Sequence, residues 1–526
     1  MRKNESKRIP IVLTAILCAA LTACAQTDAV STDPASTAAD VITVGNSSAD
    51  ESADTTQVMG TYENSEDGGH AITADGETAS YSNSSVTKTG DSEGDEADFY
   101  GENAAVFATN GAQLTLSNME ITTDGTHANA VFSYGEGTVV NISDSTINTS
   151  GNCSGGIMTT GGGTMNASNL TIHTTGNSSA AIRSDRGGGT VTVTGGDYTT
   201  DGVGSPAIYS TADITVNDAA LTSTASQGVV VEGKNSVTLN NCTLNADNNT
   251  HNSDKSDHYQ AVMIYQSMSG DADTGLSEFT ACGGSITNAN GDVFFVNNTA
   301  TDISLTGVSV TNNGDGAFLR AEAAGWGNEG SNGGKVNLYA SGQQIDGDMI
   351  IDDISVLNLY LKDSSLFTGA INSDGEAGEV YVELTGGSKW ILTDDSYITS
   401  LTCDADSIDL NGHILMVDGK EYTEGTSSTG DAIEINISEG GGNMGDMQAP
   451  PDGDMQPPQG EGMQPPQGEG MQPPQGEGME PPQGEGMQPP QDGNGQALQM
   501  PDGEPPEKPD GDMMPGGEDP PQSRHE

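Results

Sequence analysis

The sequence predicts an all-β fold, a parallel β-solenoid of about a dozen stacked coils. Three observations lead to this prediction. An eight-residue motif recurs along the chain, its fifth position is always Asn, Asp or Gly, and a further apolar pair follows sixteen or seventeen residues after the first five starts. One coil cannot bury its inner face alone, so the coils must stack on one another.

The eight-residue motif occurs six times between residues 113 and 244. Each copy opens with two apolar residues that flank a polar one, which is the period-2 pattern of a strand with one face inward. Successive copies start 26, 25, 26, 23 and 23 residues apart, so one coil takes 23–26 residues. The copies begin at Leu114, Val140, Met165, Val191, Ile214 and Val237.

The fifth position of the motif predicts a sharp bend between two short strands. Asn, Asp and Gly best tolerate the left-handed backbone conformation that such a bend requires. The residues at this position are Asn118, Asp144, Asn169, Gly195, Asp218 and Asn241. A third strand is predicted in each coil at the later apolar pairs Ala130-Val131, Gly156-Ile157, Ala181-Ile182, Ala207-Ile208 and Val230-Val231.

The composition divides the chain into four segments. Four basic residues among the first eight precede an apolar run over 9–21, which is the pattern of an export signal. A Ser/Thr/Ala/Asp-rich stretch then predicts a flexible tether, and proline-rich octads that start at Met455 predict a disordered tail. The predicted segments are a lipoprotein signal peptide (1–24), the tether (25–57), the solenoid (58–440) and the low-complexity tail (441–526).

The end of the apolar run, Leu21-Thr22-Ala23-Cys24, resembles a bacterial lipobox. This resemblance implies that Cys24 is lipidated and anchors the protein to the cell membrane, facing the cell exterior. An ordinary secretory signal, cut near Ala23 or Ala25, is the alternative. Both interpretations predict that the mature chain is exported.

The chain is strongly acidic, with 16 Lys and Arg residues against 76 Asp and Glu residues and a net charge of −60. A protein of this charge is not expected to bind nucleic acid through its phosphates. The charge instead favours solubility, divalent cations, or cationic or neutral partners, and a solvated acidic surface is the preferred interpretation. Among divalent cations, calcium is the candidate cofactor, and Asp254 and Asp257 of a polar loop are its candidate ligands. The sequence contains no EF-hand or nonapeptide calcium pattern.

Four cysteines follow the lipobox, and they occupy different positions in their repeats. The sequence holds no CxxC pair and no histidine at ligand spacing, so a zinc site is not predicted. Buried free thiols are the interpretation, with a Cys242–Cys282 bridge between neighbouring coils as the alternative. The four are Cys153, Cys242, Cys282 and Cys403.

The repeats from Ala79 to about Leu244, with weaker continuations to about Ile437, resemble a known family. They are similar to right-handed parallel β-helix proteins of the pectate-lyase-like superfamily, especially bacterial surface adhesin-like members. The resemblance covers most of the chain before the tail, and its motif V-x-V-x-(N/D/G)-x-x-I is specific for the fold and not for a function. It implies either a surface adhesin or an enzyme acting on polysaccharides.

The resemblance implies that a lyase of this family would use calcium held by carboxylates, with an Arg or Lys as the base. Arg183, Asp185 and Arg186 are the candidates, because Arg183 is expected to point outward with Asp185 close by. Their neighbours in the same column build no calcium cluster, so a solvated Arg–Asp pair is the preferred interpretation. These neighbours are Phe132, Met158 and Tyr209.

Hydrolases of this family use clustered aspartates as acid and base. The adjacent pairs Asp352-Asp353 and Asp394-Asp395 are the nearest approach to such a cluster. Neighbours on a strand point to opposite faces, so neither pair is assigned a catalytic role.

Binding of a glycan is easier to support than catalysis. Trp326 in a Gly-rich loop, Tyr209 and Tyr259 are candidates to stack on sugars. The loops 245–259 and 321–335, where the repeat breaks, are expected to carry any specificity. A flat ladder of outward polar residues is also expected, made by Thr115, Asn141, Asn166, Thr192, Thr215, Thr238, Thr280, Ser304 and Asn337.

The expected function is therefore non-enzymatic: adhesion, or binding of a polysaccharide or cell-surface glycan along one face of the β-helix. The first alternative is a polysaccharide lyase or glycoside hydrolase of the pectate-lyase-like fold, and the second is a structural spacer in the cell envelope.

Overall fold

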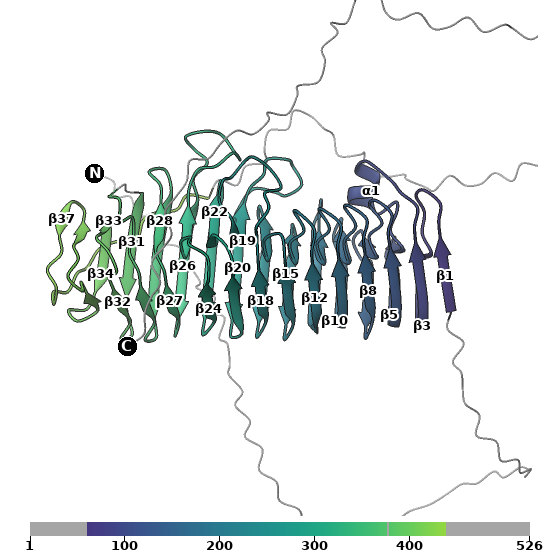
Figure 1. The fold of residues 1–526 in the computed structure, drawn as a ribbon, viewed down its shortest axis with the longest axis horizontal. Coiled ribbons are helices and arrows are strands. Elements are labelled where there is room, and N and C mark those ends of the chain that lie inside the picture. The colour runs from purple at the N-terminus through teal and green to yellow at the C-terminus, as the bar shows by residue number, and fades with distance from the viewer. Residues whose placement is uncertain (1–59, 376–377, 438–526) are drawn as a thin grey trace, which may run out of the picture. The chain divides into compact units, whose positions relative to one another are not determined.

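The computed structural model describes residues 60–375 and 378–437, and this part of the chain is a parallel β-helix (Figure 1). The repeat therefore predicted the fold correctly. The predicted signal peptide, tether and tail, together with Cys24, lie outside the described residues. A helix long and apolar enough to span a membrane is not found in the part that is described.

The largest sheet, here sheet A, collects the two strands that flank the bend of each coil. All its pairings are parallel, between one coil and the next. Its strands are β1 (Gly60–Asn64), β3 (Thr78–Lys88), β5 (Gln113–Thr123), β7 (Val139–Ser143), β8 (Thr146–Thr149), β10 (Gly163–Thr174), β12 (Gly189–Thr200), β14 (Asp213–Asn217), β15 (Ala220–Ser223), β17 (Ser236–Asn240), β18 (Thr243–Ala246), β20 (Leu276–Cys282), β21 (Ser285–Asn288), β23 (Ala300–Thr306), β24 (Ser309–Asn312), β26 (Lys335–Ser341), β29 (Val356–Lys362), β31 (Glu379–Leu384) and β34 (Ser400–Cys403).

The third strand of each coil enters a second parallel sheet, here sheet B, which has eleven strands. They are β2 (Ile72–Asp75), β4 (Val106–Thr109), β6 (Val131–Tyr134), β9 (Ile157–Thr160), β11 (Ile182–Ser184), β13 (Ile208–Ser210), β16 (Val229–Glu232), β19 (Gln260–Tyr265), β22 (Asp292–Asn297), β25 (Leu319–Ala321) and β28 (Met349–Ile351). The last coils also form two small sheets. The first contains β27 (Gln344–Asp346), β30 (Leu366–Thr368), β32 (Lys389–Ile391) and β35 (Ile408–Asp409). The second contains β33 (Ser396–Ile398), β36 (Leu415–Val417) and β37 (Lys420–Glu421). Strand β37 pairs antiparallel with β36, which departs from the parallel pattern.

The register of sheet A confirms the repeat residue by residue. The first residues of all six motif copies lie in one column, from Leu114 beside Val140 to Ile214 beside Val237. The intermediate pairs of the column follow the same register. The 23–26-residue spacing of the sequence is therefore the length of one coil.

The predicted bends are confirmed by the backbone angles. The fifth motif position has a φ between 50° and 69° in all six copies, from Asp144 at 50° to Gly195 at 69°. The side chains of this column also bond between coils, since Asn169 Nδ2 donates to Asp144 Oδ1 over 3.2 Å. Asn and Asp thus tolerate the left-handed bend and link neighbouring coils.

The outward polar ladder of sheet A is confirmed from Thr115 to Ser304, but its last predicted member is wrong. Ser304 pairs with Tyr339, whereas Asn337 pairs with Asp302, two residues earlier on the strand. The ladder then continues to Tyr360, whose ring stacks on Tyr339 with centroids 4.9 Å apart. Side chains alternate in direction along a strand, so a slip of two residues kept the correct face and misplaced only the column.

The interior is a single apolar core of stacked inward side chains. No disulfide joins Cys153, Cys242, Cys282 and Cys403 within the described residues, and Cys242 and Cys403 are buried. Cys242 Sγ donates to the Asn240 carbonyl oxygen, and Ser145, at the equivalent repeat position of another coil, makes the same contact with the Ser143 carbonyl oxygen. Cys242 and Cys403 are therefore small core side chains, whereas Cys153 and Cys282 are half-buried.

The outer face of sheet B carries the departures from the repeat. Helix α1 (Asp95–Tyr100) and the loops 247–259, 266–275 and 322–334 rise on the side of the stack that is uppermost in Figure 1. Helix α1 docks on the sheet through its backbone, because the Thr160 hydroxyl donates to the Phe99 carbonyl oxygen over 2.6 Å. The structure therefore concentrates its irregular segments over one sheet.

Candidate functional site

A single column of outward side chains runs across sheet B. The pairing register fixes its order as Phe107, Phe132, Met158, Arg183, Tyr209, Val230, Met263, Phe295 and Arg320. The column is apolar in two stretches, and each stretch belongs to a small buried cluster outside the main core. The polar side chains Arg183 and Tyr209 lie between the two clusters.

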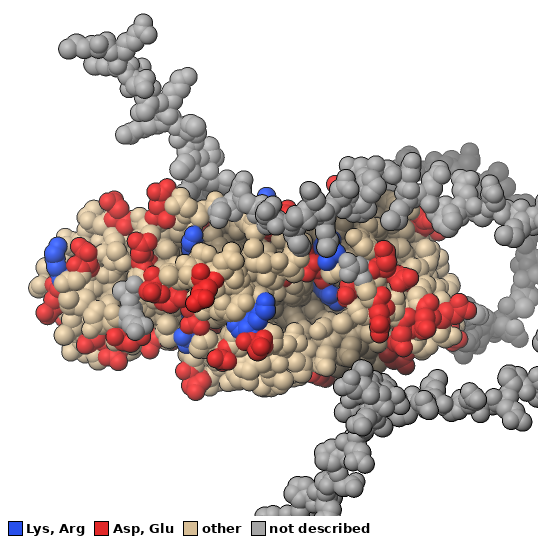
Figure 2. Space-filling model, turned by 90° about the horizontal axis from the view of Figure 1, so that it is seen from above, with Lys and Arg blue, Asp and Glu red and all other residues tan. Residues whose placement is uncertain are grey.

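A cleft opens between these clusters. Two adjoining hollows of about 270 Å³ and 110 Å³ share Tyr209 and Tyr265 in their lining. Asp98 and Asp271 line the larger hollow, and Trp326 lines the smaller one. Together they reach the lower end of the ~300–1,000 Å³ range of small-molecule sites. Figure 2 shows a hollow on this side of the stack, with Lys and Arg side chains at its edges among many acidic ones.

The Arg183–Asp185 pair lies at the floor of the cleft. Arg183 Nη2 and Asp185 Oδ2 are 2.8 Å apart, as the sequence predicted, but the pair is not solvated. Asp185 is 4% exposed and the Arg183 side chain 13%. Burial raises the pKa of Asp185 to about 6 despite the attraction of Arg183. The interpretation as a solvated pair was wrong, because the loops and α1 that cover this strand are not visible in its local sequence.

Arg186 forms the wall between the helix and the sheet. Its Nη2 lies 2.9 Å from Asp271 Oδ1, a partner 85 residues away in the chain. Its guanidinium also covers the Phe99 ring, with Cζ 3.7 Å from the ring centroid. The arginine therefore joins α1 to the 266–275 loop through a cation–π contact and an ion pair.

Glu232 is a buried carboxylate held by hydroxyl groups. It is 1% exposed and accepts hydrogen bonds from the hydroxyls of Tyr209, Tyr265 and Ser267, with Tyr265 Oη at 3.1 Å. Burial raises the pKa of both tyrosines well above the ordinary value, so both hydroxyls stay protonated and can donate. The two aromatic rings are thereby fixed in the lining of the cleft.

A second ionic network braces the loop that carries Trp326. Arg320 Nε lies 2.7 Å from Asp292 Oδ2, and Arg320 Nη1 lies 3.4 Å from Glu322 Oε2. The other Glu322 oxygen is 2.9 Å from His258 Nε2. The network thus ties the 322–334 loop to the 247–259 loop across sheet B.

We expect the ion pair between His258 and Glu322 to depend on pH. The hydrogen bond to Glu322 raises the pKa of His258 above the ordinary value of about 6.5. A raised histidine pKa stabilises the folded chain fully below about pH 6.5, and this contribution is lost as the pH rises through the folded-state value. Glu322→Gln should therefore lower the His258 pKa measured by NMR titration of the imidazole signal. The stability difference from the wild type should shrink as the pH rises.

Glu329→Gln is the matched control, since this exposed glutamate lies in the same loop. It should leave the His258 titration unchanged. An equal effect of both substitutions would show that loop charge alone, and not the hydrogen bond, sets the pKa.

The structure places the predicted sugar-stacking residues in different surroundings. Tyr209 and Trp326 both line the cleft, and the Trp326 ring meets Tyr265 edge to face with centroids 5.2 Å apart. Tyr259 stacks on His251 at 4.1 Å between centroids and does not line the hollows. The sequence segments 245–259 and 321–335 were expected to carry specificity, and the loops that they contain, 247–259 and 322–334, both border the cleft.

The predicted calcium ligands Asp254 and Asp257 are exposed on the 247–259 loop. Across 60–375 and 378–437, neither belongs to a cluster of three carboxylate, histidine or cysteine ligand atoms. Calcium binding there stays a prediction. Such a cluster does form where Asp394 and Asp395 both approach His413 Nδ1, at 3.8 and 3.9 Å. These two aspartates lie in a bend and not on a strand, so they do not point to opposite faces as predicted.

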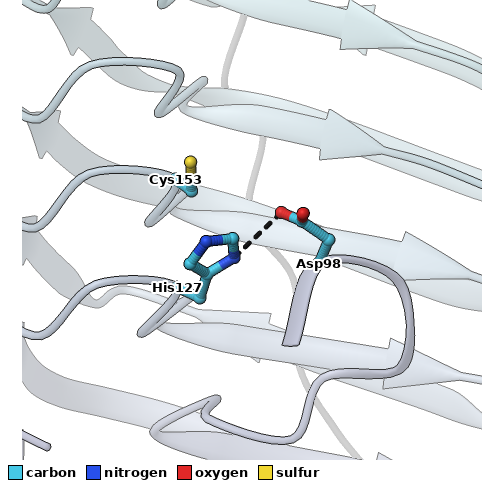
Figure 3. Close-up of side chains that lie close together, drawn as sticks. All are labelled: Asp98, His127 and Cys153. Atoms are coloured by element: carbon cyan, nitrogen blue, oxygen red, sulfur yellow. Dashed lines mark ion pairs between the residues drawn. The ribbon is translucent and has the colours of Figure 1, made fainter. Parts of the chain in front are cut away.

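A mixed cluster beside the cleft escaped the sequence analysis. Figure 3 shows Asp98, from helix α1, with His127 and Cys153, from turns of successive coils. One ligand atom of each lies within 4.8 Å of the others. Contact with the Asp98 carboxylate, and then with Cys153, raises the pKa of His127 to about 9.

The signal that could have found this cluster was the repeat itself. His127 and Cys153 are 26 residues apart, one coil length, and so share a position in the repeat. The backbone confirms this, since the His127 N–H donates to the Asn152 carbonyl and the Cys153 N–H to the Asn177 carbonyl. The place of Asp98 could not be read in this way, because α1 interrupts the repeat.

Comparison with known proteins does not assign this site. No protein-family model matches the chain, and neither a curated protein nor a solved structure was found that matches it. The fold and the two groups of side chains, the cleft and the Asp98–His127–Cys153 cluster, are therefore the basis for any function.

Proposed function

We propose that the protein binds a polysaccharide or cell-surface glycan in the cleft on sheet B. The observation that carries this proposal is the lining of the cleft, where the aromatic rings of Tyr209, Tyr265 and Trp326 lie beside buried ion pairs. Glycan sites need this combination, because aromatic rings pack on the apolar faces of sugars and fixed polar groups bond their hydroxyls.

The charges of the cleft favour a neutral glycan over an acidic one. Each arginine at the site already faces a carboxylate: Arg183 faces Asp185, and Arg186 faces Asp271. Asp98 adds a further carboxylate to the lining. Side chains that are already paired as ions can still exchange hydrogen bonds with the hydroxyl groups of a neutral sugar. The carboxylate of an acidic sugar would be repelled by the carboxylates of the cleft and by a chain whose net charge is −60.

The proposal extends to the location of the protein. The lipobox-like sequence at Cys24 supports export and a lipid anchor in the cell membrane. A tethered β-helix facing the cell exterior would present its cleft to surrounding glycans and could act in adhesion. If no glycan is bound, a structural role as an envelope spacer is the remaining interpretation.

A binding panel with matched variants tests the proposal. Neutral and acidic polysaccharides are immobilised, and retention of the full-length protein is measured. Trp326→Ala should weaken binding of the retained glycan at least about tenfold, equal to about 1.4 kcal/mol, as expected for an aromatic anchor. Tyr339→Ala, which removes a ring from the outward ladder of sheet A, should leave binding unchanged.

The opposite effects of the two variants would place the binding site on sheet A. If Tyr339→Ala abolishes retention and Trp326→Ala does not, the glycan lies along the ladder of sheet A and not in the cleft. If no polysaccharide is retained by the wild-type protein, the binding proposal fails.

A lyase or hydrolase is the second candidate, supported by one observation. The pKa of Asp185, raised to about 6, suits a general acid near neutral pH, and this buried side chain lines the cleft. The same panel addresses it, because a hydrolase releases new reducing ends and a lyase releases unsaturated uronates. Either product, lost in Asp185→Asn, would replace the binding proposal by a catalytic one.

A further inference from the structure

The Asp98–His127–Cys153 cluster brings together three different metal-ligand types. A carboxylate oxygen, an imidazole nitrogen and a thiol sulfur all lie within 4.8 Å of one another. They come from α1 and from turns of two successive coils, so no short sequence motif connects them (Figure 3). A donor set of one oxygen, one nitrogen and one sulfur is suited to Zn²⁺.

The geometry of His127 points to a ligand between these groups. His127 is 8% exposed, and its buried Nδ1 makes no hydrogen bond of regular geometry within the described residues. Asp98 Oδ1 lies 2.9 Å from this nitrogen and forms an ion pair with it (Figure 3), although no hydrogen bond of regular geometry joins the two atoms. Two ligand atoms on one metal ion stand in this relation, close together but not bonded to each other.

The backbone carries strain at the same two residues. His127 and Cys153 have φ values of 57° and 56°, in the left-handed region, and the next coils place Ser178 and Gly204 at the equivalent position. Gly204 shows that this turn accepts glycine, which would adopt the conformation without strain. A side chain there costs about 1–2 kcal/mol, and Ser178 also carries this cost, so the left-handed conformation belongs to the repeated turn, which sets His127 and Cys153 one above the other.

We propose that Asp98, His127 and Cys153 bind one Zn²⁺ ion. The protein supplies three ligands, which leaves a fourth position of a tetrahedral ion for water or a bound molecule. Asp98 and the neighbouring Ser178 line the larger hollow, so the ion would adjoin the cleft. Zinc would also fasten α1 to the solenoid. This inference does not depend on glycan binding.

Cobalt substitution of the full-length protein tests the site. Nonspecific cation binding is expected for so acidic a chain, so retained metal alone is a poor measure. Co²⁺ bound by a thiolate instead gives a near-ultraviolet charge-transfer band and strong visible bands of tetrahedral coordination. After chelation under reducing conditions, one Co²⁺ per chain should develop these bands, and Zn²⁺ should displace them.

Cys153→Ser should abolish the charge-transfer band and weaken Zn²⁺ competition more than about 100-fold, because the loss of mere outer partners already costs about 10–100-fold. The fold should survive, since Ser178 occupies the same turn position with a φ of 54°, and circular dichroism checks this. Cys242→Ser is the matched control and should keep the band, because Ser145 makes the equivalent contact elsewhere. No band in the wild type, or a band that survives Cys153→Ser, would overturn the proposal.

Discussion

Asp185→Ala is expected to lower the free energy of unfolding by about 3–5 kcal/mol. The substitution leaves Arg183 in a covered position, with a side chain 13% exposed, and removes its partner at 2.8 Å. Arg183 Nη1 already has no hydrogen-bond partner within the described residues, so the charge would lose its main compensation. Urea unfolding followed by far-ultraviolet circular dichroism measures the loss.

Two further variants separate this effect from a general loss of charge. Asp201→Ala breaks the pair with His173, in which both side chains are more than 40% exposed, and should cost at most about 1 kcal/mol. The double variant Arg183→Met with Asp185→Leu should recover most of the stability, because it removes both charges and keeps the volume. A cost for Asp185→Ala no greater than for Asp201→Ala would mean that the pair is solvated after all.

Phe294→Ala should also destabilise the protein by about 3–5 kcal/mol, through a cavity in the core. Phe294 is 0% exposed and lies between Phe279 and Phe318, with ring centroids 5.6 and 5.5 Å away. Phe279 and Phe294 belong to one coil and Phe318 belongs to the next, so the cavity should weaken the stacking of these two successive coils. Hydrogen exchange of the backbone amides should show the largest loss of protection in β20, β22 and the turn before β25.

Phe294→Leu is the comparison for this variant. It keeps an apolar side chain in the core, so it should cost clearly less than Phe294→Ala. Equal losses for the two variants would show that ring stacking and not filled volume stabilises this part of the core.

The coil of this protein could be predicted from the sequence because its rules are local. A bend at Asn118 or Asp144 depends on the conformations open to that residue, and inward residues follow from the period of a strand. Each coil pairs with the next in the same strand register, so the residues of one correctly assigned coil predict those of the neighbouring coils. The predicted register was wrong by two residues at Asn337, because the long loop before this strand interrupts the regular spacing.

The candidate site depended on segments outside the repeat. Whether Arg183 is solvated depends on α1 and on the 266–275 loop, and the contact of Asp271 with Arg186 spans 85 residues. The pairing of His127 with Cys153 could be read from one coil length, but the position of Asp98 beside them could not. By itself the sequence determined the coil, its bends and its inward faces, because these follow from short-range backbone preferences and periodicity. Only the tertiary structure decided which outward side chains are covered and which charges meet, because these follow from where the irregular segments dock on sheet B.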